Sequence, residues 1–277
     1  MRRSAATAAL LFLVLASAPA GGADREETAR ETMKLNDLKL TVLYDNYSAD
    51  EGLETAWGFA CLVEGMEETI LFDTGGEDDL LLRHMESLGA DPRAVDRVVL
   101  SHYHRDHIGG LFGFLEKNPD VTVYVPYNFP PGFRAHVEER GAKVIVVDEP
   151  VRVTASALTT GVLGGGVPEQ SLLLSTDKGV VVLTGCSHPG IARIVERARE
   201  VTGGEILLIA GGLHLLRHED DAVDRITGRL RELGVRCVAP SHCSGDRARE
   251  LFAAAYGDRF IDLGVGRVLT GADIPLP

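Results

Sequence analysis

Three histidines and one aspartate lie within six residues of the chain: His102, His104, Asp106 and His107. They follow a short apolar run at residues 97–100, which predicts a buried strand. Alternate residues at the end of an extended strand point the same way, so His102 and His104 can reach one metal ion. We expect the chain then to turn into a helix, where Asp106 and His107 face a second metal ion. Imidazole and carboxylate ligands together suit Zn, Mn or Fe(II).

The four cysteines divide into two pairs by their surroundings. Cys61 and Cys237 lie in apolar, strand-like runs, which predicts buried free thiols. Cys186 and Cys243 each lie within two residues of a histidine, which suggests a site. An even number of cysteines would allow three disulfide pairings in an exported protein. Four cysteines in a chain of 277 residues are too few for a disulfide-stabilised scaffold, so we leave the pairing open.

Short apolar runs alternate with amphipathic stretches from about residue 36 onward. The runs predict strands at Leu38–Tyr44, Trp57–Val63, Thr69–Phe72, Arg97–Leu100, Val121–Val125, Lys143–Val147, Leu172–Ser175, Val180–Leu183, Glu205–Ala210 and Val235–Val238. The stretches with helical spacing predict helices at Asp78–Leu88, Ile191–Glu200, Asp220–Leu233 and Arg247–Tyr256. This mixture of hairpins and helical crossovers favours two central sheets with helices outside them.

The composition is that of a globular protein, with 45% hydrophobic and 25% charged residues. The formal net charge is −13, from 28 basic and 41 acidic residues. An acidic chain is a poor non-specific partner for nucleic acid or anionic lipid, so we expect a small-molecule substrate. No linker or repeat follows the N-terminal segment, and residues 24–277 are predicted to form a single catalytic domain. The oligomeric state stays open.

The first 23 residues are typical of a signal peptide. Arg2 and Arg3 precede an apolar run from Ala5 to Ala16, and small residues follow it. The run is shorter than the ~20 residues that span a bilayer, which argues against a permanent anchor. We therefore expect cleavage before Gly21 or Asp24, and a periplasmic or secreted protein without stable membrane association.

The histidine cluster resembles the H-x-H-x-D-H motif of the metallo-β-lactamase superfamily. The resemblance covers nearly the whole chain after the leader. It implies a four-layer αββα sandwich of the α/β class, with a dinuclear metal site at one edge of the two sheets. The segment Ile70–Gly75 is similar to the family's strand that ends in an aspartate, which implies that Asp73 orients a metal ligand from behind.

The later family motifs are only partly present. The family's bridging aspartate follows a strand ending in Thr-Gly, and here Cys186 occupies that position. The family's histidine before the preceding hairpin is absent from residues 164–172, whereas His242 matches the family's last histidine. His188 is our candidate for the missing ligand, and Glu169 is an alternative. Cys186 either binds metal or packs behind the ligands.

Three short segments resemble one branch of the superfamily: T-G-C-S-H at 184–188, G-G-L-H-L at 211–215 and S-H-C-S-G at 241–245. The branch takes its name from a dihydropterin ribofuranosylaminobenzene phosphate synthase. In this reading His214 contacts the substrate or supports a ligand. A methanopterin precursor is cytoplasmic, so the name of the branch is a poor guide to the substrate of an exported chain.

These observations together predict a metal-dependent hydrolase of a small ester, lactone, thioester or phosphoester. The expected cofactor is two divalent metal ions, with Zn favoured over Mn or Fe. The predicted ligands are His102, His104, Asp106, His107, His188 and His242. Asp106 is also the predicted catalytic residue, because it orients the attacking hydroxide and carries the proton. Three alternatives stay open: a synthase or transferase acting on a phosphoribosyl donor, a di-iron redox enzyme, and a non-catalytic metal-binding relative.

Overall fold

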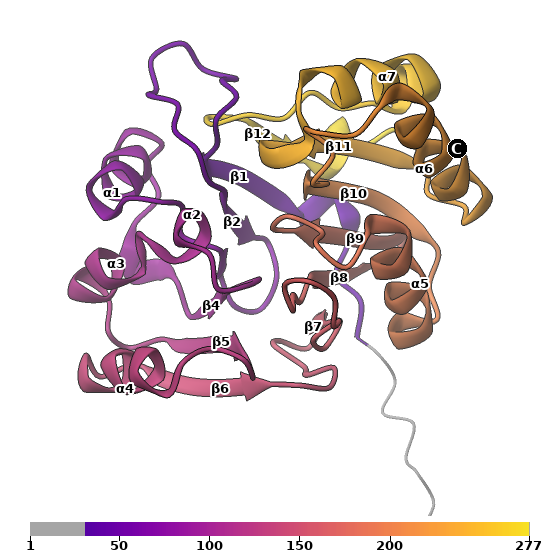
Figure 1. Ribbon diagram of the computed structural model, residues 1–277. Helices are drawn as coiled ribbons and strands as arrows, with labels where there is room; N and C mark the ends of the chain where they lie inside the picture. The colour runs from indigo at the N-terminus through magenta and orange to yellow at the C-terminus, as the bar shows by residue number, and fades with distance from the viewer. Residues whose placement is uncertain (1–30, 277) are drawn as a thin grey trace, which may run out of the picture.

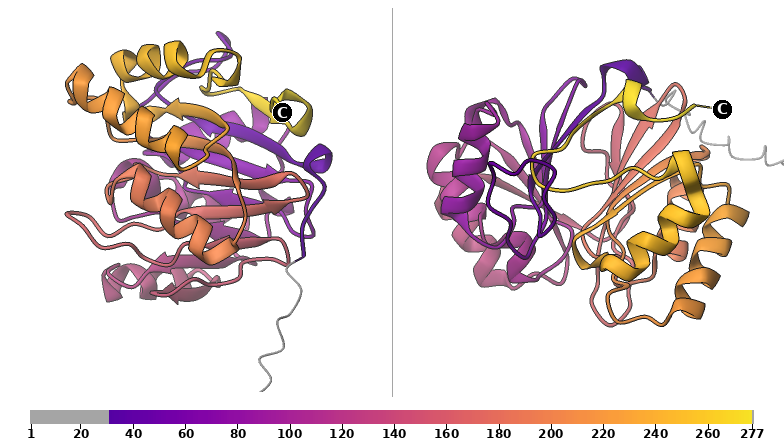
Figure 2. Two further views of the ribbon diagram at one scale, coloured as in Figure 1. Left: turned by 90° about the vertical axis from the view of Figure 1, so that its right-hand side faces the viewer. Right: turned by 90° about the horizontal axis from the view of Figure 1, so that it is seen from above.

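Two β-sheets packed face to face form the centre of the molecule (Figure 1). The computed structural model describes residues 31–276, so the predicted leader at 1–23 lies outside the described residues. Helices cover the outer face of each sheet, which gives four layers in the order helix, sheet, sheet, helix (Figure 2). The predicted αββα sandwich is therefore confirmed. The assignment of residues 24–277 to a single domain stays a prediction.

The first sheet has seven strands in the order β12-β1-β2-β3-β4-β5-β6. Strands β12, β1, β2 and β3 pair antiparallel, whereas β3, β4, β5 and β6 run parallel. The strands span Lys39–Tyr44 (β1), Ala60–Glu64 (β2), Ile70–Phe72 (β3), Arg97–Val99 (β4), Thr122–Pro126 (β5), Lys143–Val147 (β6) and Val268–Thr270 (β12).

The second sheet has five strands in the order β11-β10-β9-β8-β7. Strands β7, β8 and β9 form an antiparallel meander, and β9, β10 and β11 run parallel. The strands span Ala157–Thr159 (β7), Leu172–Thr176 (β8), Gly179–Thr184 (β9), Ile206–Gly212 (β10) and Cys237–Ser241 (β11).

Three apolar cores hold the layers together. The core between the sheets includes Leu40, Phe72, Leu174 and Leu207, all fully buried. A second core lies under α1–α4 and a third under α5–α7. The helices span Asp78–Ser87 (α1), Arg105–Ile108 (α2), Leu111–Lys117 (α3), Pro131–Glu139 (α4), Ile191–Thr202 (α5), Asp220–Glu232 (α6) and Asp246–Tyr256 (α7). Removing such apolar surface from water stabilises the fold by roughly 25 cal/mol per Å².

Most of the predicted strands form within a few residues of their expected bounds, and two begin more than one residue later. The strand predicted from Trp57 begins at Ala60, because the Phe59 N–H donates to the Asp106 carbonyl, 3.2 Å away, instead of to a neighbouring strand. The strand predicted from Val235 begins at Cys237, because the Val235 N–H donates to the Leu230 carbonyl at the end of α6.

The carboxyl ends of β3, β9, β10 and β11 each lead into a residue with unusual backbone geometry. Among residues 31–276, four non-glycine residues have positive φ: Asp73 at 56°, Ser187 at 64°, His214 at 55° and His242 at 47°. The parallel pairing of β9, β10 and β11 brings three of these ends to one edge of the second sheet. Strained backbone of this kind is typical of functional sites, where surrounding contacts hold it in place.

Candidate metal centre

Asp73 organises the loop that follows β4. Its carboxylate accepts hydrogen bonds from the Ser101 N–H and from the Ser101 hydroxyl, both at 2.7 Å. Its Oδ2 also lies 2.7 Å from Nδ1 of His107, and Ser101 Oγ lies 2.9 Å from Nδ1 of His102. One buried carboxylate therefore fixes His107 directly and His102 through Ser101. Both rings turn Nε2 toward other candidate ligands, His104 and Cys186, as expected when an aspartate orients metal ligands.

Glycines allow the loop after β4 to pack closely against its neighbours. A Cβ added at Gly109 would collide with the carbonyl oxygen of Gly76, and one at Gly110 with that of Thr74. The Gly109 N–H also donates to the Gly75 carbonyl at 2.9 Å. This close approach holds the turn that carries Asp106 and His107 against the end of β3.

His102, His104 and His188 form the first group of candidate ligands. Nε2 of His102 lies 3.0 Å from Nδ1 of His104, and the His188 ring centroid lies 4.8 Å from that of His102 and 5.0 Å from that of His104. Burial holds the pKa of His102 well below its usual value and lowers the pKa of His188 to about 4. The neutral imidazoles that result offer the lone pairs that a metal ion binds.

Asp106, His107 and His242 form the second group. Oδ2 of Asp106 lies 3.3 Å from Nε2 of His242 and 3.6 Å from Nε2 of His107. Although burial raises it, the hydrogen bond from His242 and the charge of His107 hold the pKa of Asp106 below its usual range. Asn46 fixes His242 from behind, since its Oδ1 lies 2.9 Å from Nδ1 of that ring. Because its pKa is lowered, the carboxylate of Asp106 is ionised at neutral pH.

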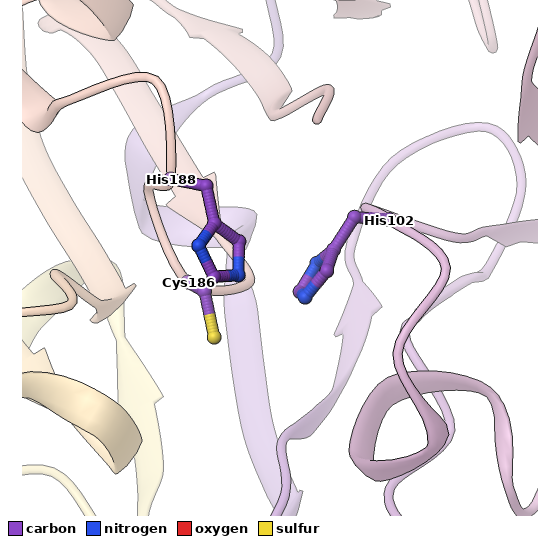
Figure 3. Close-up of side chains that lie close together, drawn as sticks. All are labelled: His102, Cys186 and His188. Atoms are coloured by element: carbon purple, nitrogen blue, oxygen red, sulfur yellow. The ribbon is translucent and has the colours of Figure 1, made fainter. Parts of the chain in front are cut away.

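Cys186 lies between the two groups. Its sulfur is within 4.8 Å of ligand atoms of His102 and His188, and also of ligand atoms of His107 and His242. The distance from Cys186 Sγ to His107 Nε2 is 3.2 Å. Figure 3 shows Cys186 and His188 on one side of the site and His102 facing them. A side chain that contacts both groups is in the position of a bridging ligand.

The donor atoms of the site fit divalent metal ions. Nε2 of His188 is buried and has no hydrogen-bond partner among the described residues. A buried nitrogen without a partner is costly, and coordination to a metal ion would satisfy it. The set of imidazole, carboxylate and thiolate groups suits Zn²⁺ well.

Glu169 lies behind the loop that carries Cys186 and His188. Its Oε1 accepts the N–H groups of Cys186 and Ser187, both at 2.9 Å, and its Oε2 accepts the N–H of His188 at 2.7 Å. Burial raises the pKa of Glu169 to about 7, against the lowering effect of these N–H groups. The carboxylate is thus occupied by backbone donors, and its geometry suits a positioning residue better than a replacement ligand.

We expect Glu169→Gln to weaken metal binding about 10- to 100-fold, the range seen when residues behind metal ligands are changed. Glutamine has one acceptor oxygen where the carboxylate has two, so at least one of the three N–H groups loses its partner. Isothermal titration of metal-free protein with Zn²⁺ measures the effect. Glu86→Gln, at an exposed position on α1, is the matched control and should bind normally. Unchanged affinity in Glu169→Gln would show that the loop holds its shape without these bonds.

His214 lies at the mouth of the site, outside both ligand groups. Its ring centroid is 4.3 Å from that of His188, and its backbone N–H donates to Cys243 Sγ at 3.2 Å. His214 and Cys243 also line a cavity of about 820 Å³. Trp57 lines the same cavity and lies with its ring centroid 4.7 Å from that of His242. A substrate could therefore reach the candidate ligands through this cavity.

Sequence reasoning missed the residues that support the ligands from distant segments. Asn46 and Trp57 contact His242 although about 190 residues separate them in the chain. Asp45 and Asn46 directly follow the predicted strand at Leu38–Tyr44, and these two polar residues at a strand end were the available signal. Asp45 accepts hydrogen bonds from the Ser241 hydroxyl and the Tyr47 N–H, which ties the end of β1 to the end of β11.

We expect Asp45→Asn to flatten the pH dependence of stability between about pH 4 and pH 6. Burial raises the pKa of Asp45 from 3.8 to about 6. The folded state therefore binds the proton more tightly than the unfolded state, and this carboxyl contributes stability that falls as pH rises through that window. The contribution is on the order of 3 kcal/mol. Urea unfolding of both proteins at several pH values measures it. Identical pH profiles would contradict the assignment.

The comparisons with known proteins agree with this geometry. The family model described as the metallo-beta-lactamase superfamily matches residues 58–242, which is more than half of the chain. This chain belongs to the metallo-β-lactamase superfamily. The solved structure of Tm1679, a metal-dependent hydrolase of the beta-lactamase superfamily, is 28% identical with a TM-score of 0.69, and the match covers 84% of this chain and 98% of that one.

Other relatives extend the comparison within the superfamily. The 7,8-dihydropterin-6-methyl-4-(beta-D-ribofuranosyl)-aminobenzene-5'-phosphate synthase of Methanocaldococcus jannaschii is 25% identical, and the match covers 85% of this chain and 97% of the synthase. The fold of YhfI from Bacillus subtilis is also similar, with a TM-score of 0.64 at 17% identity over 84% of this chain and 99% of that one. The predicted resemblance to the superfamily and to this synthase branch is confirmed.

The prediction of an exported protein with a signal peptide is wrong. It rested on residues 1–23, whereas a relative that matches 85% of the chain is the archaeal synthase of Methanocaldococcus jannaschii. Export therefore gives no reason to separate this chain from that branch. Within residues 31–276, no helix combines the length and the apolar character needed to cross a membrane.

Proposed function

We propose that this superfamily member is a metal-dependent hydrolase of small esters, lactones, thioesters or phosphoesters. The observation that carries the proposal is the meeting of two groups, His102/His104/His188 and Asp106/His107/His242, at the sulfur of Cys186. Each group would offer three side chains to one divalent metal ion, and the Cys186 sulfur lies within 4.8 Å of ligand atoms in both groups. Tm1679, whose fold this chain shares, is described as a metal-dependent hydrolase, which supports the same reaction class.

Two divalent cations bound in this way would supply Lewis acidity and lower the pKa of an attacking water toward neutrality. The chain's own residues position the ligands and transfer the proton of the attacking water. Asp106 is ionised and partly exposed, so its carboxylate can accept a proton from the water and return it to the leaving group. Asp73 and Asn46 keep His107 and His242 in place while this occurs.

The cavity beside the site suits a small-molecule substrate. Its volume of about 820 Å³ lies within the range of small-molecule sites. Trp57 and Leu216 are about half exposed and line it, which gives the substrate an apolar surface next to His242. His214 lines the same cavity, with its ring centroid 4.3 Å from that of His188, and can donate a hydrogen bond to a polar group of the substrate.

A synthase or transferase that acts on a phosphoribosyl donor is the second candidate. Its support is the similarity to the Methanocaldococcus jannaschii synthase over 85% of the chain. The same site could activate a different nucleophile against such a donor. Release of pyrophosphate from a phosphoribosyl diphosphate, with little hydrolysis of simple esters, would favour this candidate.

Elemental analysis combined with a substrate panel tests both candidates. The purified protein would be loaded with Zn, Mn or Fe and assayed on esters, lactones, thioesters, phosphodiesters and a phosphoribosyl diphosphate. We expect about two metal ions per chain and hydrolysis of at least one class, lost in Asp106→Asn. Metal binding without any turnover would favour the non-catalytic alternative, and an iron-dependent visible band with redox activity would favour the di-iron alternative.

A further inference from the structure

Two thiols meet beyond the end of β10. Cys186 follows β9 and Cys243 follows β11, and these strands flank β10 on its two sides. The sulfur atoms nevertheless lie within 4.8 Å of each other, because both loops fold inward over the end of the central strand. Cys243 Sγ also lies 3.7 Å from the carbonyl oxygen of Cys186.

Gly212, the last residue of β10, keeps the space between the two cysteines open. A Cβ at this position would lie 2.7 Å from Cys243 Sγ and 3.3 Å from the Cα of Cys186. The added atom would also lie 2.3 Å from the Gly185 carbonyl oxygen, so any larger residue would force Gly185 and Cys243 to move. Cys243 can approach the backbone at position 212 this closely because glycine has no Cβ.

The pair is also accessible from the substrate cavity. Cys243 lines that cavity together with His214, although its own exposure is only 4%. Cys61 and Cys237, by contrast, are enclosed in the core between the two sheets. A small oxidant that enters the cavity therefore meets Cys243 first and Cys186 directly behind it.

We propose that Cys186 and Cys243 form a reversible disulfide when a peroxide reaches the metal-free centre. One thiol loses its proton and attacks the peroxide, forming a sulfenic acid and releasing one water. The second sulfur displaces the hydroxyl group as a second water, so two thiols and one hydrogen peroxide give one disulfide and two waters. A thiol reductant restores the two thiols.

Disulfide formation would change the metal centre. The proposal rests on the proposed function in one respect, namely that Cys186 binds metal. A disulfide withdraws the Cys186 sulfur from both histidine groups at once, so the oxidised protein should bind metal at least about tenfold more weakly. Bound metal in turn occupies the sulfur and should protect it. The centre would thus be open to oxidation only when it is empty.

Peptide mapping tests the disulfide itself, independently of activity. Metal-free protein treated with stoichiometric hydrogen peroxide should yield a linked peptide pair containing Cys186 and Cys243, removed by dithiothreitol. Zn-loaded protein should yield little of it. Cys243→Ser should yield no linked peptide pair and should retain its Co²⁺ affinity after peroxide treatment. Cys237→Ala is the control, because Cys237 lies in β11, the strand that leads to Cys243, and this variant should behave like the wild type.

Three results would overturn the proposal. One is the survival of both thiols in metal-free protein after treatment. Another is a disulfide that links a different pair. The third is that the protein forms no disulfide but binds one additional Co²⁺ ion, and that the Cys243 variant does not bind this ion. Cys186, His214 and Cys243 would then be a metal site and not a disulfide pair. A disulfide that forms but leaves Co²⁺ affinity unchanged would instead remove Cys186 from the proposed ligands.

Discussion

His102→Ala should lose at least one metal ion per chain, and activity should fall about 100-fold or more. His102 is fully buried, its ring is held by Ser101, and its Nε2 lies 3.0 Å from Nδ1 of His104. Changes behind metal ligands already cost about 10- to 100-fold in affinity, and loss of a direct ligand should cost at least as much. Elemental analysis after dialysis, followed by assay of the best substrate, measures both effects.

Asp106→Ala should have a similar effect on the second group and should also remove the proton carrier. His136→Ala is the control for both variants, because His136 is exposed on α4 and far from the site in sequence and in contacts. It should keep full metal content and activity. Full metal occupancy in His102→Ala would show that the histidine cluster does not bind metal in the proposed way.

The second large effect is expected at His188, where the chain departs from the family pattern. His188→Ala should lose the metal ion that His102 and His104 hold, since it removes one of three ligands in that group. The buried Nε2 of His188 has no other partner among the described residues, which supports a role as ligand. Metal titration of the variant measures the stoichiometry and affinity directly.

Variants of Cys186 complete this test. If the thiolate bridges the two ions, Cys186→Ala should weaken the second metal ion, and Cys186→Asp should keep two ions with a preference shifted from Zn toward Mn or Fe. If Cys186 only packs behind the ligands, Cys186→Ala should have little effect on metal content. Its 3.2 Å distance to His107 Nε2 favours the bridging role. Unchanged affinity in His188→Ala would move the missing ligand to His214.

The parts of the site that lie close together in the sequence could be predicted from it. The cluster at residues 102–107 needs only a strand end and a turn to bring four side chains together, and residue types and spacing reveal both. The fold came from the family resemblance, because hydrophobic periodicity finds strands but does not order them in sheets. Predicted strand bounds differed most from the structure at Phe59 and Val235. There the backbone N–H donates to a carbonyl of the site or of a helix end and not to a neighbouring strand.

The supporting contacts could not be predicted, because they join segments far apart in the chain. Asn46 meets His242 and Asp45 meets Ser241 only after two sheets have packed together. Glu169 was considered as a ligand because of its type, whereas its function depends on three backbone N–H groups that no side-chain pattern reveals. Nor did the separation of 57 residues between Cys186 and Cys243 indicate that their sulfurs meet.

The four left-handed residues at the strand ends have a consequence for how this lineage can diverge. Asp73, Ser187, His214 and His242 hold a backbone conformation that glycine adopts without strain, at a cost of order 1 kcal/mol each. Drift toward glycine at positions 73, 214 or 242 would relieve that strain and delete a side chain of the site in a single step. Backbone strain at these positions therefore favours glycine, whereas the buried hydrogen bonds of Asp73 and His242 oppose it. A homologous chain with glycine at 73 or 242 should be sought among paralogues that have kept the sandwich and lost the chemistry.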